Sequence, residues 1–179
     1  MNQELYHVSA NPHVRDKVTT QKLMLYVILA LLPTTIVGFV NFGLSAVINV
    51  AVTTATCVIA EYVWQKLMHK KITIMDLSAA LTGLLLGMNL SSQTPVWIAA
   101  IGSVVAIIVV KQMFGGLGFN FANPAMTARI VLLVSFAGQM SNYVSPIDAV
   151  TTATPLANNT PITLKELFFG MHSGEIGET

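Results

Sequence analysis

The residues best suited to carry chemistry lie in a hydroxyl-rich loop, Asp148–Thr154, which follows a series of long apolar segments. A threonine hydroxyl is a poor nucleophile, so a phosphoester on Thr154 requires an enzyme that recognises the surrounding sequence. Ala153 leaves that hydroxyl accessible, Pro155 biases Thr154 towards an extended backbone, and Asp148 offers a charge to a modifying enzyme. The loop is therefore a candidate attachment site for a phosphate-linked group such as a flavin. The alternative is an ordinary turn of Asp, Thr and Pro.

The segments that must position this loop are unusually apolar. Of the 179 residues, 54% are hydrophobic and 9% are charged, whereas a soluble domain carries roughly 25% charged residues. Three stretches contain no charged residue, namely Leu23–Ala60, Leu77–Val110 and Ile130–Ile147. Since a spanning helix needs about 20 mostly apolar residues, the composition predicts an all-α, polytopic membrane protein. The formal net charge of +1 argues against a nucleic-acid-binding surface.

We expect about five membrane segments in a helical domain of residues 23–137, after a polar amino-terminal arm of residues 1–22 and before a polar, loop-like tail of residues 138–179. Asn123 suits the cap of the fifth segment and Pro124 its first position. Two segments are short, and they are either broken or re-entrant helices that line a pathway or short helices buried by their neighbours. The expected segments are Leu23–Asn41, Leu44–Trp64, Leu77–Leu90, Val96–Val110 and Pro124–Ala137.

The distribution of positive charge predicts the orientation in the cell membrane. If every apolar segment crosses, the amino terminus is cytoplasmic and the Thr154 loop is extracytoplasmic. This orientation does not follow if a short segment re-enters instead of crossing. The basic residues that then share the cytoplasmic face are Arg15, Lys17, Lys22, Lys66, Lys70, Lys71 and Lys111.

Two strings in the chain resemble signatures of one known family. The string Gly115–Arg129, GGLGFNFANPAMTAR, looks like that of the B subunit of the sodium-pumping NADH:quinone reductase and the D subunit of the Rnf complex. The Asp148–Thr154 loop is similar to the flavinylation motif of the same family, Asp-x-x-Ser/Thr-Gly/Ala/Ser-Ala-Thr. The opening of the chain, Ser9–Met24, resembles the short arm of the Rnf subunit, whereas the quinone-reductase subunit usually has a longer extension.

The resemblance implies a cofactor and its attachment site. In the family the final Thr of the motif carries FMN through a phosphoester, which a flavin transferase installs from FAD, and that role falls to Thr154. Asp148, Thr151 and Ala153 match other positions of the motif, while Thr152 departs from the small, Gly-like residue usual there. A second, non-covalent flavin is also compatible with the resemblance, at a position that the sequence does not locate.

The implied function is that of a membrane subunit of an ion-translocating ferredoxin:NAD⁺ oxidoreductase of the Rnf type, and hence of a translocase. Such a subunit would pass electrons, coupled to export of Na⁺ or H⁺, among partner subunits that carry iron–sulfur clusters and another covalent flavin. Two alternatives stay open: the B subunit of the NADH:quinone reductase, and a channel or transporter scaffold without a redox cofactor. Family members are roughly twice this length, with about ten helices in two repeats, so we expect this chain to resemble the first repeat.

Arg129 is the one strong base inside an apolar segment. A buried cation costs at least about 2.5 kcal/mol at a helix centre, so such a residue usually has a partner. It either snorkels to the cytoplasmic interface, contacts a flavin ring, or pairs with a carboxylate of a partner. The expected topology places it near the face opposite Thr154. Glu61 and Asp76 border predicted spans and are either interfacial or attend a sodium or proton path, whereas Cys57 is expected to be a small residue facing lipid or a helix.

Overall fold

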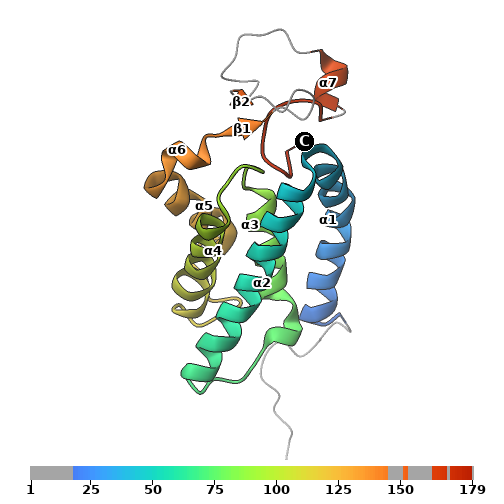
Figure 1. The fold of residues 1–179 in the computed structure, drawn as a ribbon. Coiled ribbons are helices and arrows are strands. Elements are labelled where there is room, and N and C mark those ends of the chain that lie inside the picture. The colour runs from blue at the N-terminus through green and yellow to red at the C-terminus, as the bar shows by residue number, and fades with distance from the viewer. Residues whose placement is uncertain (1–17, 145–150, 153–162, 169, 179) are drawn as a thin grey trace, which may run out of the picture.

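The computed structural model describes residues 18–144, 151–152, 163–168 and 170–178. In this part of the chain, helices run alternately up and down in one bundle (Figure 1). The predicted all-α class is confirmed, with a single pair of two-residue strands beside the helices among the described residues. The elements are α1 (Thr20–Phe42), α2 (Leu44–Leu67), η1 (Ile74–Asp76), α3 (Ser78–Met88), α4 (Val96–Val104), η2 (Val105–Gln112), α5 (Pro124–Ser135), α6 (Ala137–Met140), β1 (Tyr143–Val144), β2 (Thr151–Thr152) and α7 (Leu164–Phe168).

The first two helices are the two in the described part that are long and apolar enough to cross a membrane. Helix α1 begins where the hydroxyl of Thr19 accepts a hydrogen bond from the amide of Lys22 at 3.4 Å. It ends at Gly43, whose φ of +66° lets the chain reverse directly into α2. Many large apolar side chains of α1 are exposed, which is unusual in water and expected in contact with lipid.

Helix α3 packs against α2 more closely than ordinary side chains allow. Gly83 and Gly87 face α2 from one side of α3. A Cβ atom on Gly83 would lie 2.5 Å from Cα of Thr54, and one on Gly87 would lie 2.6 Å from Oγ1 of Thr53. Small residues spaced by four are a common means of bringing membrane helices close together. The short α3 is therefore held by backbone proximity to α2.

The fourth apolar segment is a single rod that changes its winding halfway along. Helix α4 passes directly into η2, a π-helix that ends at Gln112. The sequence predicts a helix here but gives no sign of the π geometry. Cys57 of α2 is fully buried against this rod, with Sγ 3.8 Å from the carbonyl oxygen of Ser103, so the expectation of a small helix-facing residue is confirmed.

Helix α5 starts as the sequence predicts. Oδ1 of Asn123 accepts a hydrogen bond from the amide of Ala125 at 3.0 Å, and Pro124 occupies the first helical turn. Three glycines in the preceding loop have positive φ values, and they form the turn between η2 and α5: Gly115, Gly116 and Gly118. This turn returns the chain along the bundle.

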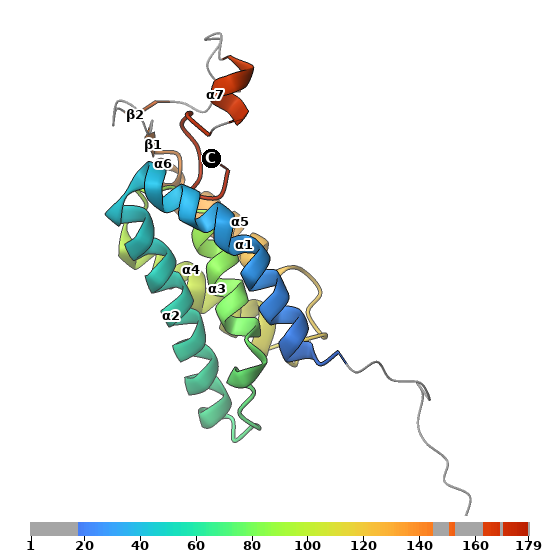
Figure 2. The same ribbon diagram turned by 90° about the vertical axis from the view of Figure 1, so that its right-hand side faces the viewer.

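The segment that follows α7 differs from the expected polar, loop-like tail. It returns to the bundle, where Ile176 is fully buried. The amide of Ile176 donates to the carbonyl of Leu90 at 3.2 Å, and the amide of Gly177 donates to that of Met88 at 2.8 Å. Non-helical backbone inside an apolar bundle needs such partners. Figures 1 and 2 show this returning segment, β1 and β2 at the same end of the bundle.

We predict that Gly83→Ala destabilises the protein by about 1–3 kcal/mol, because the added methyl group overlaps the backbone of α2. The matched control is Gly138→Ala, since a Cβ at Gly138 meets open space and alanine has the higher helix propensity. Thermal unfolding in detergent, followed by tryptophan fluorescence, compares the two. Equal melting temperatures for both variants would contradict the close α2–α3 contact.

Candidate functional site

The predicted flavinylation loop is described at one point, the strand β2. The backbone of Thr151 and Thr152 forms this strand, opposite Val144 and Tyr143 of β1. Asp148, Ala153 and Thr154 lie outside the described residues. Their assigned roles therefore stay predictions.

The strand pair is joined to the bundle through the break between α3 and α4. The hydroxyl of Ser91 in this break donates to the carbonyl of Asn142, the residue before β1. The side-chain amide of Asn49, buried in α2, donates to the carbonyls of Ser91, Ser92 and Thr94 at 3.4, 3.3 and 3.1 Å. The loop that carries the motif thus begins on a hydrogen-bonded, buried platform.

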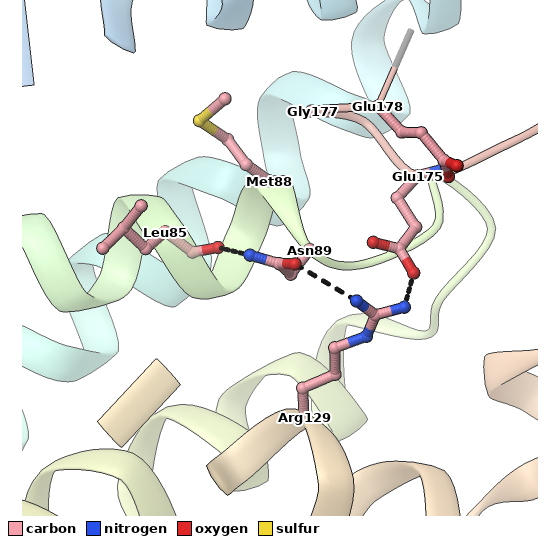
Figure 3. A pocket seen from close by; sticks show the side chains of 7 residues that line it. All are labelled: Leu85, Met88, Asn89, Arg129, Glu175, Gly177 and Glu178. Carbon is pink, nitrogen blue, oxygen red and sulfur yellow. Dashed lines mark hydrogen bonds and ion pairs between the residues drawn. The ribbon is translucent and has the colours of Figure 1, made fainter. Parts of the chain in front are cut away.

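Arg129 reaches from α5 into a cavity of about 340 Å³ at the end of α3 (Figure 3). Its guanidinium pairs with the carboxylate of Glu175 and donates to Oδ1 of Asn89 at 3.2 Å. The side-chain amide of Asn89 in turn donates from Nδ2 to the carbonyl oxygen of Leu85 at 2.8 Å. With Glu178 also on the wall, one cation faces two carboxylates, so the cavity favours a neutral or cationic guest over an anion.

One expectation about Arg129 is corrected. The carboxylate that it binds is that of Glu175, so it comes from this chain and not from a partner. Glu175 belongs to the returning segment, which lies at the same end of the bundle as β1 and β2 (Figure 1). The side of the membrane on which Arg129 lies stays a prediction. Contact between Arg129 and a flavin ring stays a prediction, and the excess of negative charge around the cavity weakens it for a reduced, anionic ring.

A second charged cluster lies towards the opposite end of the bundle. Lys111 of η2 and Glu61 of α2 are each 1% exposed, and Nζ of Lys111 lies 2.9 and 3.0 Å from the two carboxylate oxygens. Lys111 is buried because η2 turns it inwards onto α2, and its assignment to the cytoplasmic face stays a prediction. Glu61 is buried against it inside the bundle, so the interfacial interpretation of Glu61 is wrong.

Side-chain amides surround the carboxylate of Glu61. Nε2 of Gln112 donates to Oε1 at 2.6 Å, and Nε2 of Gln65 donates to the same atom at 3.2 Å. Gln65 is itself oriented by Thr73, whose amide donates to Oε1 of Gln65 at 2.9 Å. Such additional hydrogen bonds are what make a buried ion pair tolerable.

Lys111 is also connected by hydrogen bonds to residues nearer the surface of the bundle. Its Nζ donates to Oγ of Ser78 at 2.6 Å, and that hydroxyl donates to Oδ1 of Asp76 at 2.6 Å. The amide of Ser78 donates to the same carboxylate oxygen at 2.9 Å, so Asp76 satisfies the first amide of α3, which has no partner within the helix. The cluster therefore connects α2, η1, α3 and η2.

The pairing of Glu61 with Lys111 was missed from the sequence, although a signal for it was present. Helices α2 and η2 both end at the same side of an alternating bundle. An acid and a base that each lie within two turns of such an end are at similar depth. Opposite charges at similar depth in apolar segments are candidates for a pair.

The described fold and its two polar clusters can be set beside known proteins. Residues 7–179 match the family described as the NQR2, RnfD, RnfE family. The chain belongs to this family. As a member of the NQR2, RnfD, RnfE family with two helices of spanning length, it is a membrane protein. The family that the sequence resembles is confirmed, while the role of the Asp148–Thr154 loop stays a prediction.

Two curated relatives of this family member are similar over nearly its whole length. The D subunit of the Na⁺-translocating ferredoxin:NAD⁺ oxidoreductase complex of Acetobacterium woodii is 47% identical over 189 residues, which cover 99% of this chain and 59% of the relative. The D subunit of the proton-translocating ferredoxin:NAD⁺ oxidoreductase complex of Clostridium ljungdahlii is 38% identical over 197 residues, which cover 100% and 60%. The chain thus spans about three fifths of the length of these relatives.

We predict that Lys111→Met destabilises this NQR2, RnfD, RnfE family member by about 3–5 kcal/mol, because the Glu61 carboxylate is left buried without its cation. The double variant Glu61→Gln, Lys111→Met removes both charges, so its stability should be closer to that of the wild-type protein. Unfolding in detergent measures both. Losses that simply add in the double variant would show that the two side chains do not interact.

Proposed function

We propose that this chain carries FMN through a phosphoester on Thr154 and passes electrons as the D subunit of an Rnf-type, ion-translocating ferredoxin:NAD⁺ oxidoreductase. The Asp148–Thr154 motif supports the cofactor, and the names of the relatives support the complex. FMN, when bound, supplies electron transfer, whereas the protein supplies attachment and position. Partner subunits of the complex would carry the iron–sulfur clusters, since such a cluster usually needs four thiolates and this chain has one cysteine.

The structural observation that carries the proposal is the anchored stem of the motif. Thr151 and Thr152, inside the motif, belong to a strand that pairs with β1, and the residue before β1 is bonded to Ser91 of the buried break. A group on Thr154, two residues beyond β2, would be attached next to a hydrogen-bonded strand. A cofactor site is better defined when it rests on such elements than on an unsupported loop.

The proposed setting is the cell membrane, with the amino terminus inside and the Thr154 loop outside. Exposed apolar side chains on α1 support contact with lipid or with helices of other subunits. A flavin transferase would act on the loop from the outer side. The relatives differ in the ion that their names give, one Na⁺ and one H⁺, so either ion is compatible with the proposed complex.

An ion-moving scaffold without a redox cofactor is the second candidate function. The buried pair of Glu61 and Lys111 favours it, because ionisable residues inside membrane helices commonly serve ion pathways. The same pair is equally compatible with ion transport in a redox complex. The cofactor is therefore the feature that separates the scaffold from the Rnf-type subunit and from the third candidate, the B subunit of the quinone reductase.

We predict that the denatured wild-type protein, from cells with an active flavin transferase, gives a fluorescent band on a gel. Thr154→Ala should abolish the fluorescence because it removes the only oxygen to which the proposed phosphoester is attached. Thr160→Ala, a threonine outside the motif, is the matched control and should stay fluorescent. Mass spectrometry of the peptide that contains Thr154 identifies the adduct.

The outcomes distinguish the candidates. A dark wild-type band favours the scaffold without a cofactor. A band that is fluorescent in Thr154→Ala would move the attachment to another residue. Assay of the fluorescent complex with ferredoxin and with quinone as electron partners separates the Rnf-type subunit from that of the quinone reductase.

A further inference from the structure

A continuous series of hydrogen bonds leads from the edge of the bundle to its buried acid. It starts at Asp76, which is half-buried in η1, and passes to Ser78 at 2.6 Å and on to Lys111 at 2.6 Å. Lys111 then contacts Glu61 at 2.9 Å. We propose that Asp76, Ser78, Lys111 and Glu61 form a proton relay that loads and unloads Glu61, an inference that rests on the proposed ion-translocating function.

The relay works because each inner member can both give and take a proton. Lys111 donates a proton from Nζ to Glu61, and its amine then accepts a proton from the hydroxyl of Ser78. Ser78 is restored by a proton from Asp76, whose partly exposed carboxylate has first taken that proton from water. One N–H and two O–H bonds break while one N–H and two O–H bonds form. The net result is that a proton moves from Asp76 to Glu61 with no change of oxidation state.

Burial lowers the cost of the first of these transfers. In water an ammonium–carboxylate pair is strongly favoured over the neutral amine and acid, but removing two charges from water is expensive. Glu61 and Lys111 are both fully buried, so the neutral pair is closer in free energy to the ion pair than it is in solvent. The bundle thus makes the proton between the two residues easier to move.

The position of Lys111 joins the buried acid to the start of α3. Its Nζ bonds to the hydroxyl of Ser78, the first residue of α3. Lys111 also lies in a π-helix, a feature that is frequent at functional sites.

The surroundings of Glu61 leave one described proton route to it. Gln65 and Gln112 bind its carboxylate through amide N–H groups, which hold its position but do not readily exchange protons. Cys57, one turn earlier in α2, is fully buried, and its thiol donates to the carbonyl oxygen of Ser103 at 3.8 Å. Asp76 is thus the described acid that connects the relay to the surface. It lies at the end of the bundle that carries the Lys66–Asp76 connector.

The test uses the assembled complex in inverted membrane vesicles, driven by reduced ferredoxin and NAD⁺, with valinomycin and K⁺ present to remove the electrical potential. Two variants interrupt the relay with little change in packing. Ser78→Ala removes the hydroxyl but keeps the amide bond to Asp76, and Asp76→Asn keeps an acceptor but no longer carries a proton. Both should lower the rate of vesicle acidification at least about tenfold.

Two control variants separate the relay from a structural role. Ser78→Thr retains the hydroxyl and should restore most of the acidification that Ser78→Ala loses. Ser103→Ala removes an equally buried serine hydroxyl, which bonds within its own helix to the carbonyl of Ala99 at 2.8 Å, and should also leave the rate unchanged. The flavin fluorescence of every variant on a denaturing gel reports whether the subunit has matured, and it should equal that of the wild type.

Wild-type acidification by Ser78→Ala or Asp76→Asn would overturn the relay. Accumulation of Na⁺ without acidification by the wild-type complex would overturn it as well. Failure of the proposed function is a different result, because the wild-type band is then dark. If both relay variants lose flavin fluorescence, the solvent deuterium isotope effect on acidification by the wild-type complex decides. A rate that is slower in deuterium oxide supports the relay, and an unchanged rate rejects it.

Discussion

The structure depends on a pair of opposite charges that are buried together in an apolar bundle. Neither Glu61 nor Lys111 could lie there alone, because an unpaired charge in such surroundings costs several kcal/mol. A typical protein is stable by only about 5–15 kcal/mol. The pair therefore decides which helices lie together: α2 and η2 must meet at one depth, and Ser78 brings the start of α3 to the same place.

The two ends of the bundle have different polar chemistry, and α2 connects them. Near one end, Asn49 holds the break between α3 and α4, which supports β1 and the stem of the motif. Twelve residues further along, Glu61 lies in the charged cluster, about 18 Å away along the helix axis. Both polar clusters therefore include residues of one continuous helix, α2.

The sequence predicts the class of fold and most helix limits, because long uncharged stretches and an Asn-Pro cap have direct local causes. Asn123 caps α5 as expected, and Gly43 marks the reversal between the first two helices. The sequence does not predict the π-helix, because the residues of η2 carry no local signal that distinguishes it from an α-helix. The pairing of Glu61 with Lys111 also escapes local analysis, because 50 residues separate them.

At the candidate flavin site, too, local sequence predicts some features and distant contacts determine others. A motif predicts attachment at Thr154, because a modifying enzyme would recognise local sequence. It gives no information on the platform of Ser91 and Asn49 or on the return of Ile176 into the bundle. The polar composition of the tail does not predict that this segment packs into the bundle, since a few apolar residues among many polar ones are enough to hold a short segment there. The carboxylate that pairs with Arg129 belongs to the same segment, at Glu175.

The connection between Asn142 and Ile176 is fastened at both ends to adjacent residues, Ser91 and Leu90. The two hydrogen bonds close this connection into a non-covalent ring, because Leu90 and Ser91 are neighbours in the chain. A protease that cut this ring once would release neither piece, because each remains bonded to the same short segment. The nicked molecule would migrate as a single particle in mild detergent and separate into two polypeptides only in strong denaturant.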